Sequence, residues 1–110
     1  MSDKTVILTS NVNAETNDTY ESPAIQNGKS WVLKRFGACD INMGDNKSSV
    51  YALKFGDDIL RIISVTGNTH EIIMNKEITG NGTKTVKIIR MNKSGVEKQL
   101  PCWLTAYERG

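Results

Sequence analysis

The sequence predicts an all-β fold: an antiparallel β-sandwich of two sheets, jelly-roll-like in its winding, with about 7–8 strands. From Trp31 onward, short segments rich in apolar and β-branched residues are separated by turns of Gly, Asn and Asp. Apolar and polar residues alternate within these segments, which is typical of antiparallel strands that bury one face. No segment longer than one turn has the period of a helix.

Six segments from residue 30 onward are predicted to be strands. They are Ser30–Phe36, Ser48–Phe55, Ile59–Thr66, Thr69–Thr79, Thr83–Asn92 and Val96–Tyr107. The connections between the later ones are short and contain residues that tolerate positive φ in tight turns. These connections are Gly56-Asp57-Asp58, Gly67-Asn68, Gly80-Asn81-Gly82 and Asn92-Lys93-Ser94-Gly95. Such closely spaced turns favour a sandwich or a barrel.

The last predicted strand has two distinct faces. One face is apolar except for Lys98 and should lie on the core; it comprises Val96, Lys98, Leu100, Cys102, Leu104 and Ala106. Trp103 and Tyr107 share the opposite face and predict a second apolar surface there. Such a surface marks a protein interface or a platform for stacking sugar rings. The alternative is that the N-terminal arm or a long loop covers Trp103.

The N-terminal residues 1–19 are predicted to form an arm, and residues 20–110 the β-sandwich domain. Thr5–Ser10 is rich in β-branched residues and forms either a first strand or an arm that pairs with a neighbouring subunit. Asn11–Thr19 is polar, without an apolar period, and is expected to be a flexible loop. Val6 and Leu8 of the arm join Trp103 and Tyr107 as candidate partner contacts.

Composition indicates one globular domain without a membrane span. The chain has 110 residues, 38% hydrophobic and 24% charged, which is the ordinary globular range. No apolar run is long enough to cross a bilayer, and the N-terminus lacks the pattern of a signal peptide, so a cytosolic origin or a missing targeting segment is expected. Basic residues cluster around the last hairpin, at Lys84, Lys87, Arg90, Lys93 and Lys98. We interpret them as a solvated face that protects an edge, and nucleic-acid binding as unlikely.

No set of residues predicts catalysis, a metal site or a cofactor. His70 is the only histidine, and no oriented acid or nucleophile accompanies it in the sequence. Gly56-Asp57-Asp58 is explained as a turn, and Asp40–Asp45 fails the calcium-loop pattern. Cys39 and Cys102 are too few for a zinc site, and whether they pair in a disulfide stays open. We therefore expect a protein that is not an enzyme.

The segment Tyr20–Ala38 carries a resemblance to a known class. It contains an extended Ser-Pro-x-Ile, an Asn-Gly turn and then Trp-Val-Leu-Lys-Arg-Phe-Gly-Ala. This order resembles the opening strands of small jelly-roll virion proteins, and the nearest class is the head decoration, or cement, proteins of tailed bacteriophages. The resemblance is one of pattern, extends over most of the chain, and gives no residue a role.

The resemblance implies a non-enzymatic structural protein on the capsid surface of a virion, made in the host cytoplasm. Such a protein stabilises contacts between subunits of the major capsid protein, and it is expected to be a homo-oligomer, a dimer or a trimer. The alternative is a carbohydrate- or receptor-binding β-sandwich of a phage fibre or similar structure. The sequence leaves open the partner, the oligomer number and the order of the strands.

Overall fold

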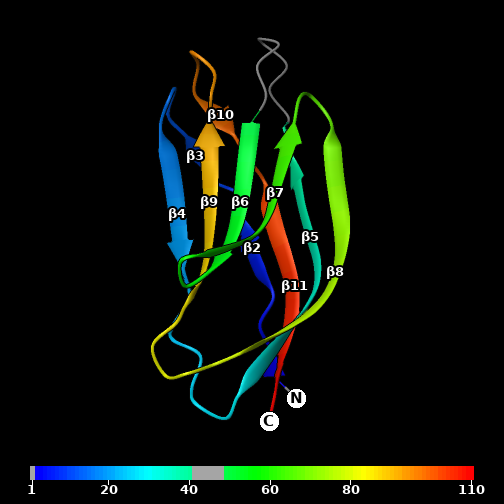
Figure 1. Cartoon of the computed structure of the whole chain (residues 1–110). Coiled ribbons are helices and arrows are strands. Elements are labelled where there is room, and N and C mark those ends of the chain that lie inside the picture. The colour runs from blue at the N-terminus through cyan, green and yellow to red at the C-terminus, as the bar shows by residue number, and fades with distance from the viewer. Residues whose placement is uncertain (1, 41–48) are drawn as a thin grey trace.

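The computed structural model describes residues 2–40 and 49–110. In these residues the chain forms eleven strands and no helix, and all strand pairs are antiparallel. Two sheets face each other across one core (Figure 1). The predicted all-β sandwich is therefore confirmed. The number of strands exceeds the predicted 7–8 because several strands have only two or three residues.

The first sheet is built around the last strand of the chain. Its order is β1-β11-β5-β8, and β2 also pairs with β11. The bounds are β1 Ser2–Asp3, β2 Val6–Leu8, β5 Ser30–Cys39, β8 Thr69–Thr79 and β11 Cys102–Arg109. The N-terminal strands thus complete the edge of this sheet beside β11, as Figure 1 shows.

The second sheet has the order β4-β9-β6-β7. The bounds are β4 Asn17–Glu21, β6 Ser49–Phe55, β7 Asp58–Val65 and β9 Val86–Asn92. A small third sheet pairs β3 (Asn11–Val12) with β10 (Lys98–Gln99) at one end of the sandwich. The predicted strand Val96–Tyr107 is divided into β10 and β11 at Leu100 and Pro101. Proline has no backbone N–H to donate to a ladder, which fits this interruption.

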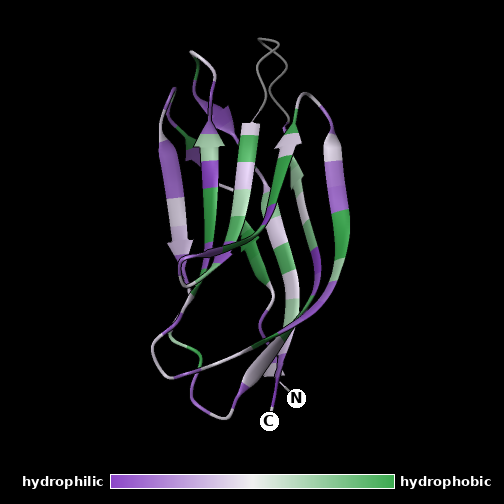
Figure 2. Ribbon diagram, viewed as in Figure 1, coloured by the Kyte–Doolittle hydropathy of each residue, from purple (hydrophilic) through white to green (hydrophobic). Residues whose placement is uncertain are grey.

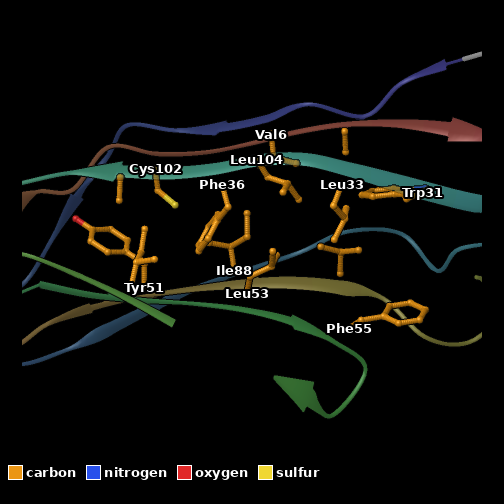
Figure 3. Close-up of a cluster of buried hydrophobic side chains, with 14 of the residues drawn as sticks. Val6, Trp31, Leu33, Phe36, Tyr51, Leu53, Phe55, Ile88, Cys102 and Leu104 are labelled. Carbon is orange, nitrogen blue, oxygen red and sulfur yellow. The ribbon is translucent and has the colours of Figure 1, made fainter. Parts of the chain in front are cut away.

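Alternation along the strands fills the core. In β5 the buried side chains include Trp31, Leu33 and Phe36, and they face Tyr51 and Leu53 of the other sheet (Figure 3). The apolar face predicted for the last strand is confirmed, because Lys98, Leu100, Cys102, Leu104 and Ala106 are all buried. Val96 departs from it and is 43% exposed. Figure 2 shows the resulting alternation of hydrophobic and hydrophilic residues along the ribbons.

The expectation of a flexible loop over Asn11–Thr19 is wrong. Asn11–Val12 pairs with β10, and Asn17–Glu21 forms edge strand β4, which pairs with β9. A buried guanidinium explains why such a polar segment is ordered. Arg90 of β9 is 1% exposed, and its NH2 group donates to Asp18 Oδ2 at 2.8 Å. The same guanidinium donates to the Ser10 carbonyl at 2.8 Å and to the Leu100 carbonyl at 2.9 Å.

The two cysteines are free. Cys102 points into the core, whereas Cys39 is half-buried at the end of β5. Cys102 pairs across the ladder with Ala38, so Cys39 lies one position away and on the opposite face. Burial raises the pKa of the Cys102 thiol to about 12, so it stays protonated at neutral pH.

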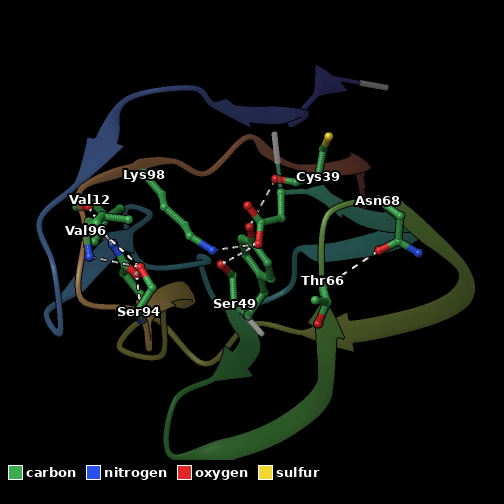
Figure 4. A network of polar contacts seen from close by, with 11 residues as sticks. Val12, Cys39, Ser49, Thr66, Asn68, Ser94, Val96 and Lys98 are labelled. Carbon is green, nitrogen blue, oxygen red and sulfur yellow. Dashed lines mark hydrogen bonds and ion pairs between the residues drawn. The ribbon is translucent and has the colours of Figure 1, made fainter. Parts of the chain in front are cut away.

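A second buried cation lies at the end of the sandwich that carries β10. The ammonium of Lys98 is 3.1 Å from Asp40 Oδ2, and both side chains are almost completely buried (Figure 4). Ser49 Oγ donates to the same oxygen at 3.3 Å. Two of the five basic residues of the last hairpin, Arg90 and Lys98, are therefore internal ion-pair partners. They contribute nothing to a basic surface.

Candidate functional site

The outer face of the first sheet presents a tryptophan held flat across the strands. Trp103 on β11 has Gly37 of β5 beside it in the ladder, and Glu71 of β8 lies opposite Gly37. A Cβ atom at Gly37 would lie 2.5 Å from Cε2 and Cζ2 of the indole. The ring therefore lies directly on the Gly37 backbone, and only glycine leaves room for it.

Polar contacts fix the ring in this position. The indole Nε1–H of Trp103 donates to Glu71 Oε2 at 2.7 Å. Arg35 donates to the other oxygen, Glu71 Oε1, at 3.0 Å. The hydrogen bond from Trp103 and then that from Arg35 hold the pKa of Glu71 below its usual value. Glu71 is thus ionised at neutral pH, and the tryptophan is a preorganised half-buried aromatic.

Exposed isoleucines lie on either side of this aromatic. Ile7 of β2 pairs with Trp103 and is 70% exposed. Ile73 of β8 lies opposite Arg35 of β5, on the same face of the sheet and two strands away from Trp103, and is 66% exposed. Val32 and Tyr107 are paired further along the same face and are half-buried. We call this surface, formed by Ile7, Val32, Ile73, Trp103 and Tyr107, the Trp103 face.

The four residues expected to contact a partner have different positions in the structure. Trp103 and Tyr107 lie on the outer face, as their parity predicts. Val6 is 9% exposed and belongs to the core, and Leu8 packs against that core. Their side chains are covered by this chain itself, and Ile7 between them faces outward. The arm therefore supplies Ile7, not Val6, to this surface.

Sequence reasoning missed a second apolar surface, on the outer face of the other sheet. Its members are paired across β9, β6 and β7, and we call it the Ile62 face: Val50, Ala52, Ile62, Ile89 and Met91. Ile62 is 51% exposed, whereas Val50, Ile89 and Met91 are half-buried and Ala52 is 4% exposed. The sequence did indicate this surface, because β6 and β9 carry apolar residues at both even and odd positions and therefore on both faces of the sheet.

The described residues offer little for other kinds of site. They hold no group of three or more His, Cys, Asp or Glu side chains placed to bind a metal ion. Most of the rejected calcium loop, from residue 41 onward, lies outside them. No helix of the length and hydropathy that a bilayer crossing requires occurs in residues 2–40 or 49–110. Two cavities of about 270 and 260 Å³ lie near the N-terminal strands. Both are smaller than the ~300–1,000 Å³ pockets that take drug-sized ligands.

Comparison with known proteins identifies the fold. No protein-family model matches the sequence, and no curated protein is similar to it. Among solved structures, the Drosophila NLP core is 15% identical, and the match covers 100% of both chains with a TM-score of 0.55. At this identity the likeness shows a shared β-sandwich fold alone.

Two weaker matches bear on the sequence-based hypotheses. A CBM36-1 domain of a xylanase from the hindgut metagenome of Trinervitermes trinervoides is 12% identical, with a TM-score of 0.36 over 97% of each chain. A chain of infectious bursal disease virus is 9% identical, with a TM-score of 0.35 over 97% of this chain and 31% of that one. A virus protein and a carbohydrate-binding module thus occur among the neighbours, but at these scores neither supports a role.

Substituting Gly37 should displace the tryptophan. In Gly37→Ala the new methyl group occupies the position of the indole, so we expect Trp103 to leave the sheet and lose its bond to Glu71. The expected result is a red shift of tryptophan emission and a loss of about 1 kcal/mol in unfolding free energy. Gly95→Ala is the matched control, since a Cβ at Gly95 meets no atom. Unchanged emission in Gly37→Ala would contradict the flat position of the ring.

Proposed function

We propose that this protein is a non-enzymatic structural protein that binds a larger protein assembly through the Trp103 face. The observation that carries the proposal is the pair of exposed isoleucines on either side of a preorganised tryptophan. Ile7 lies directly beside Trp103, and the Arg35–Glu71 ion pair lies between Trp103 and Ile73. Exposed apolar side chains with charged groups at their edge, on a sheet whose other face forms the core, mark a contact with another molecule. Trp, Tyr and Arg are also the residues enriched at the energetic centres of protein interfaces.

The setting we propose is the surface of a phage capsid, where the chain would stabilise contacts between capsid subunits as a decoration protein. The resemblance of Tyr20–Ala38 to the opening strands of such proteins supports this setting. The Drosophila NLP core, whose structure is described as giving insight into pentamer formation and histone binding, has the same fold. That supports a sandwich of this size as a scaffold for assembly and protein binding, by analogy of fold.

A test follows from Trp103. Particles isolated from the culture that makes this chain should bind the purified wild-type protein in a sedimentation assay. Truncating an aromatic at the centre of an interface costs about 2 kcal/mol, so Trp103→Ala should bind about 30-fold more weakly. Because Trp103 is half-buried, Ile73→Glu serves as a second variant at a more exposed position. Val96→Ala, outside the Trp103 face, is the control and should bind like wild type. A wild-type chain that stays in the supernatant would contradict the proposal.

A carbohydrate-binding role is the second candidate, and one observation favours it. Trp103 lies flat beside Arg35 and Glu71, so a ring for stacking and groups for hydrogen-bonding hydroxyls are adjacent. The exposed isoleucines favour a protein partner instead, because they offer a sugar no hydrogen bonds. A glycan array read together with tryptophan fluorescence separates the two. Binding to a glycan together with a change of Trp103 emission would support the carbohydrate-binding role. An array without any binding would exclude that role.

A further inference from the structure

The chain contains two Asn-Gly pairs, and the structure holds them differently. They are Asn27-Gly28, in the connection from β4 to β5, and Asn81-Gly82, in the connection from β8 to β9. Hydrogen bonds join the two connections at the end of the sandwich where both termini lie (Figure 1). An asparagine that precedes glycine is prone to an intramolecular reaction. Glycine has no Cβ to obstruct the approach of its nitrogen to the asparagine side chain.

This reaction is deamidation, and it needs no enzyme. The glycine nitrogen loses its proton and bonds to Cγ of asparagine, the bond from Cγ to Nδ2 breaks, and ammonia leaves. Water then opens the five-membered succinimide at one of its two carbonyls. The products are aspartate and isoaspartate, and in isoaspartate the main chain runs through Cγ and is longer by one methylene. The reacting nitrogen and carbon must be able to come into contact for the first step.

Hydrogen bonds restrain both reacting groups at Asn81-Gly82. Asn81 Oδ1 accepts from the Thr83 backbone N–H at 2.9 Å, from Thr83 Oγ1 at 3.0 Å and from the Lys84 backbone N–H at 2.8 Å. The Gly82 N–H donates to the Ile25 carbonyl at 2.9 Å. These bonds must break before the nitrogen attacks Cγ. One hydrogen bond of ordinary strength that breaks first slows a reaction about tenfold.

Asn27-Gly28 has none of these restraints. Both residues are exposed, and within residues 2–40 and 49–110 no hydrogen bond holds the Asn27 side chain or the Gly28 N–H. The turn is closed by the Lys29 N–H, which donates to the Gln26 carbonyl at 3.0 Å. The space around Gly28 is open, because a Cβ there would meet no atom within 4 Å. The side chain of Asn27 is therefore free to rotate toward the Gly28 nitrogen, and water reaches both.

We propose that Asn27 is a site of spontaneous deamidation, and that the fold protects Asn81 from the same reaction. The inference goes beyond the proposed function, because neither pair belongs to the Trp103 face. It assigns a covalent modification to the connection between the two sheets, since β4 and β5 belong to different sheets.

Deamidation at Asn27 changes a connection that is bonded on both sides. The Lys29 carbonyl accepts from the Gly80 N–H at 2.8 Å, and the Lys29 ammonium donates to the Gly110 carbonyl at 3.0 Å. Either product adds a negative charge two residues before Lys29. Isoaspartate also lengthens the main chain inside the turn that Lys29 and Gln26 close. The modified turn therefore no longer fits its hydrogen bonds at the start of β5.

Peptide mapping of the aged protein tests the proposal. The full purified chain is kept in a mildly alkaline buffer, and its tryptic peptides are quantified by mass spectrometry over several weeks. The two sites fall in different peptides, because Lys29 ends the first and Lys76 and Lys84 enclose the second. We expect deamidation at Asn27 to be at least about tenfold faster than at Asn81. Labelling by an isoaspartyl methyltransferase should detect isoaspartate at position 27.

The same chain in guanidinium chloride is the matched control, since unfolding removes the hydrogen bonds of Asn81, and the two sites should then react at similar rates. In the folded chain Asn27→Gln should abolish the fast reaction, because the longer side chain forms its six-membered ring slowly. Equal rates in the folded protein, or a faster reaction at Asn81, would overturn the proposal. So would a difference that persists in guanidinium chloride, because neighbouring residues and not the fold would then set the rates. The particle-binding experiment has no bearing on these results.

Discussion

Replacing Arg90 by methionine should lower the free energy of unfolding by about 3 kcal/mol. All five guanidinium donors of Arg90 are used: two bond Asp18, two bond Ser10, and one bonds the Leu100 carbonyl. Methionine fills part of the volume but leaves the buried Leu100 carbonyl without its donor, and a buried polar group without a partner costs about 1–3 kcal/mol. The bonds to Ser10 and Asp18 are lost as well. Asp18 is 44% exposed and can be solvated, which keeps the loss below that of a fully buried pair.

Urea denaturation followed by fluorescence measures this effect. Lys87→Met is the matched control, because Lys87 is on the same strand with its side chain 29% exposed and its partner Glu21 54% exposed. A pair at the surface, with one half-buried and one exposed side chain, contributes about 0–1 kcal/mol, so the control should stay close to wild type. Hydrogen exchange should also show faster exchange at β4 in Arg90→Met, since Asp18 anchors that strand. Equal stability of the two variants would mean that Arg90 does not hold the N-terminal segment.

The same residue shows where sequence reasoning reaches its limit. The strands of the core could be predicted because apolar residues alternate along them, and burial follows parity. Asn17–Glu21 has no such alternation, and its order depends on Arg90, which lies far away in the sequence. A polar edge strand held by a distant buried cation gives no local signal. The sequence therefore predicts a loop there.

The candidate surfaces were predictable to different degrees. Parity placed Trp103 outside because its neighbours Cys102 and Leu104 are apolar. Parity alone does not say which face of the short Val6–Leu8 strand is buried, since all three residues are apolar. Pairing with β11 decides it and turns Ile7 outward. The role of Gly37 as the space under the indole depends on the register of β11 with β5, which no local pattern contains.

The buried pair Lys98–Asp40 gives the largest effect that we expect from a single substitution. Their charged atoms are 3.1 Å apart, and the side chains are 0% and 1% exposed. Lys98→Met removes the ammonium and leaves the Asp40 carboxylate buried, where Ser49 Oγ remains as a donor to it. An uncompensated buried charge costs about 3–5 kcal/mol, so the variant should be destabilised by that amount in urea denaturation.

The double variant Lys98→Met with Asp40→Asn tests the cause. Replacing a buried ion pair by hydrophobic residues of similar volume is often nearly neutral for stability, whereas removing one partner is strongly destabilising. Asp40→Asn removes the negative charge and keeps the volume of the side chain. If Lys98→Met loses stability because the Asp40 carboxylate is buried without its cation, the double variant should recover most of the lost unfolding free energy. If the double variant is as unstable as Lys98→Met, the lysine acts through the packing of its aliphatic chain, and the ion pair itself contributes little.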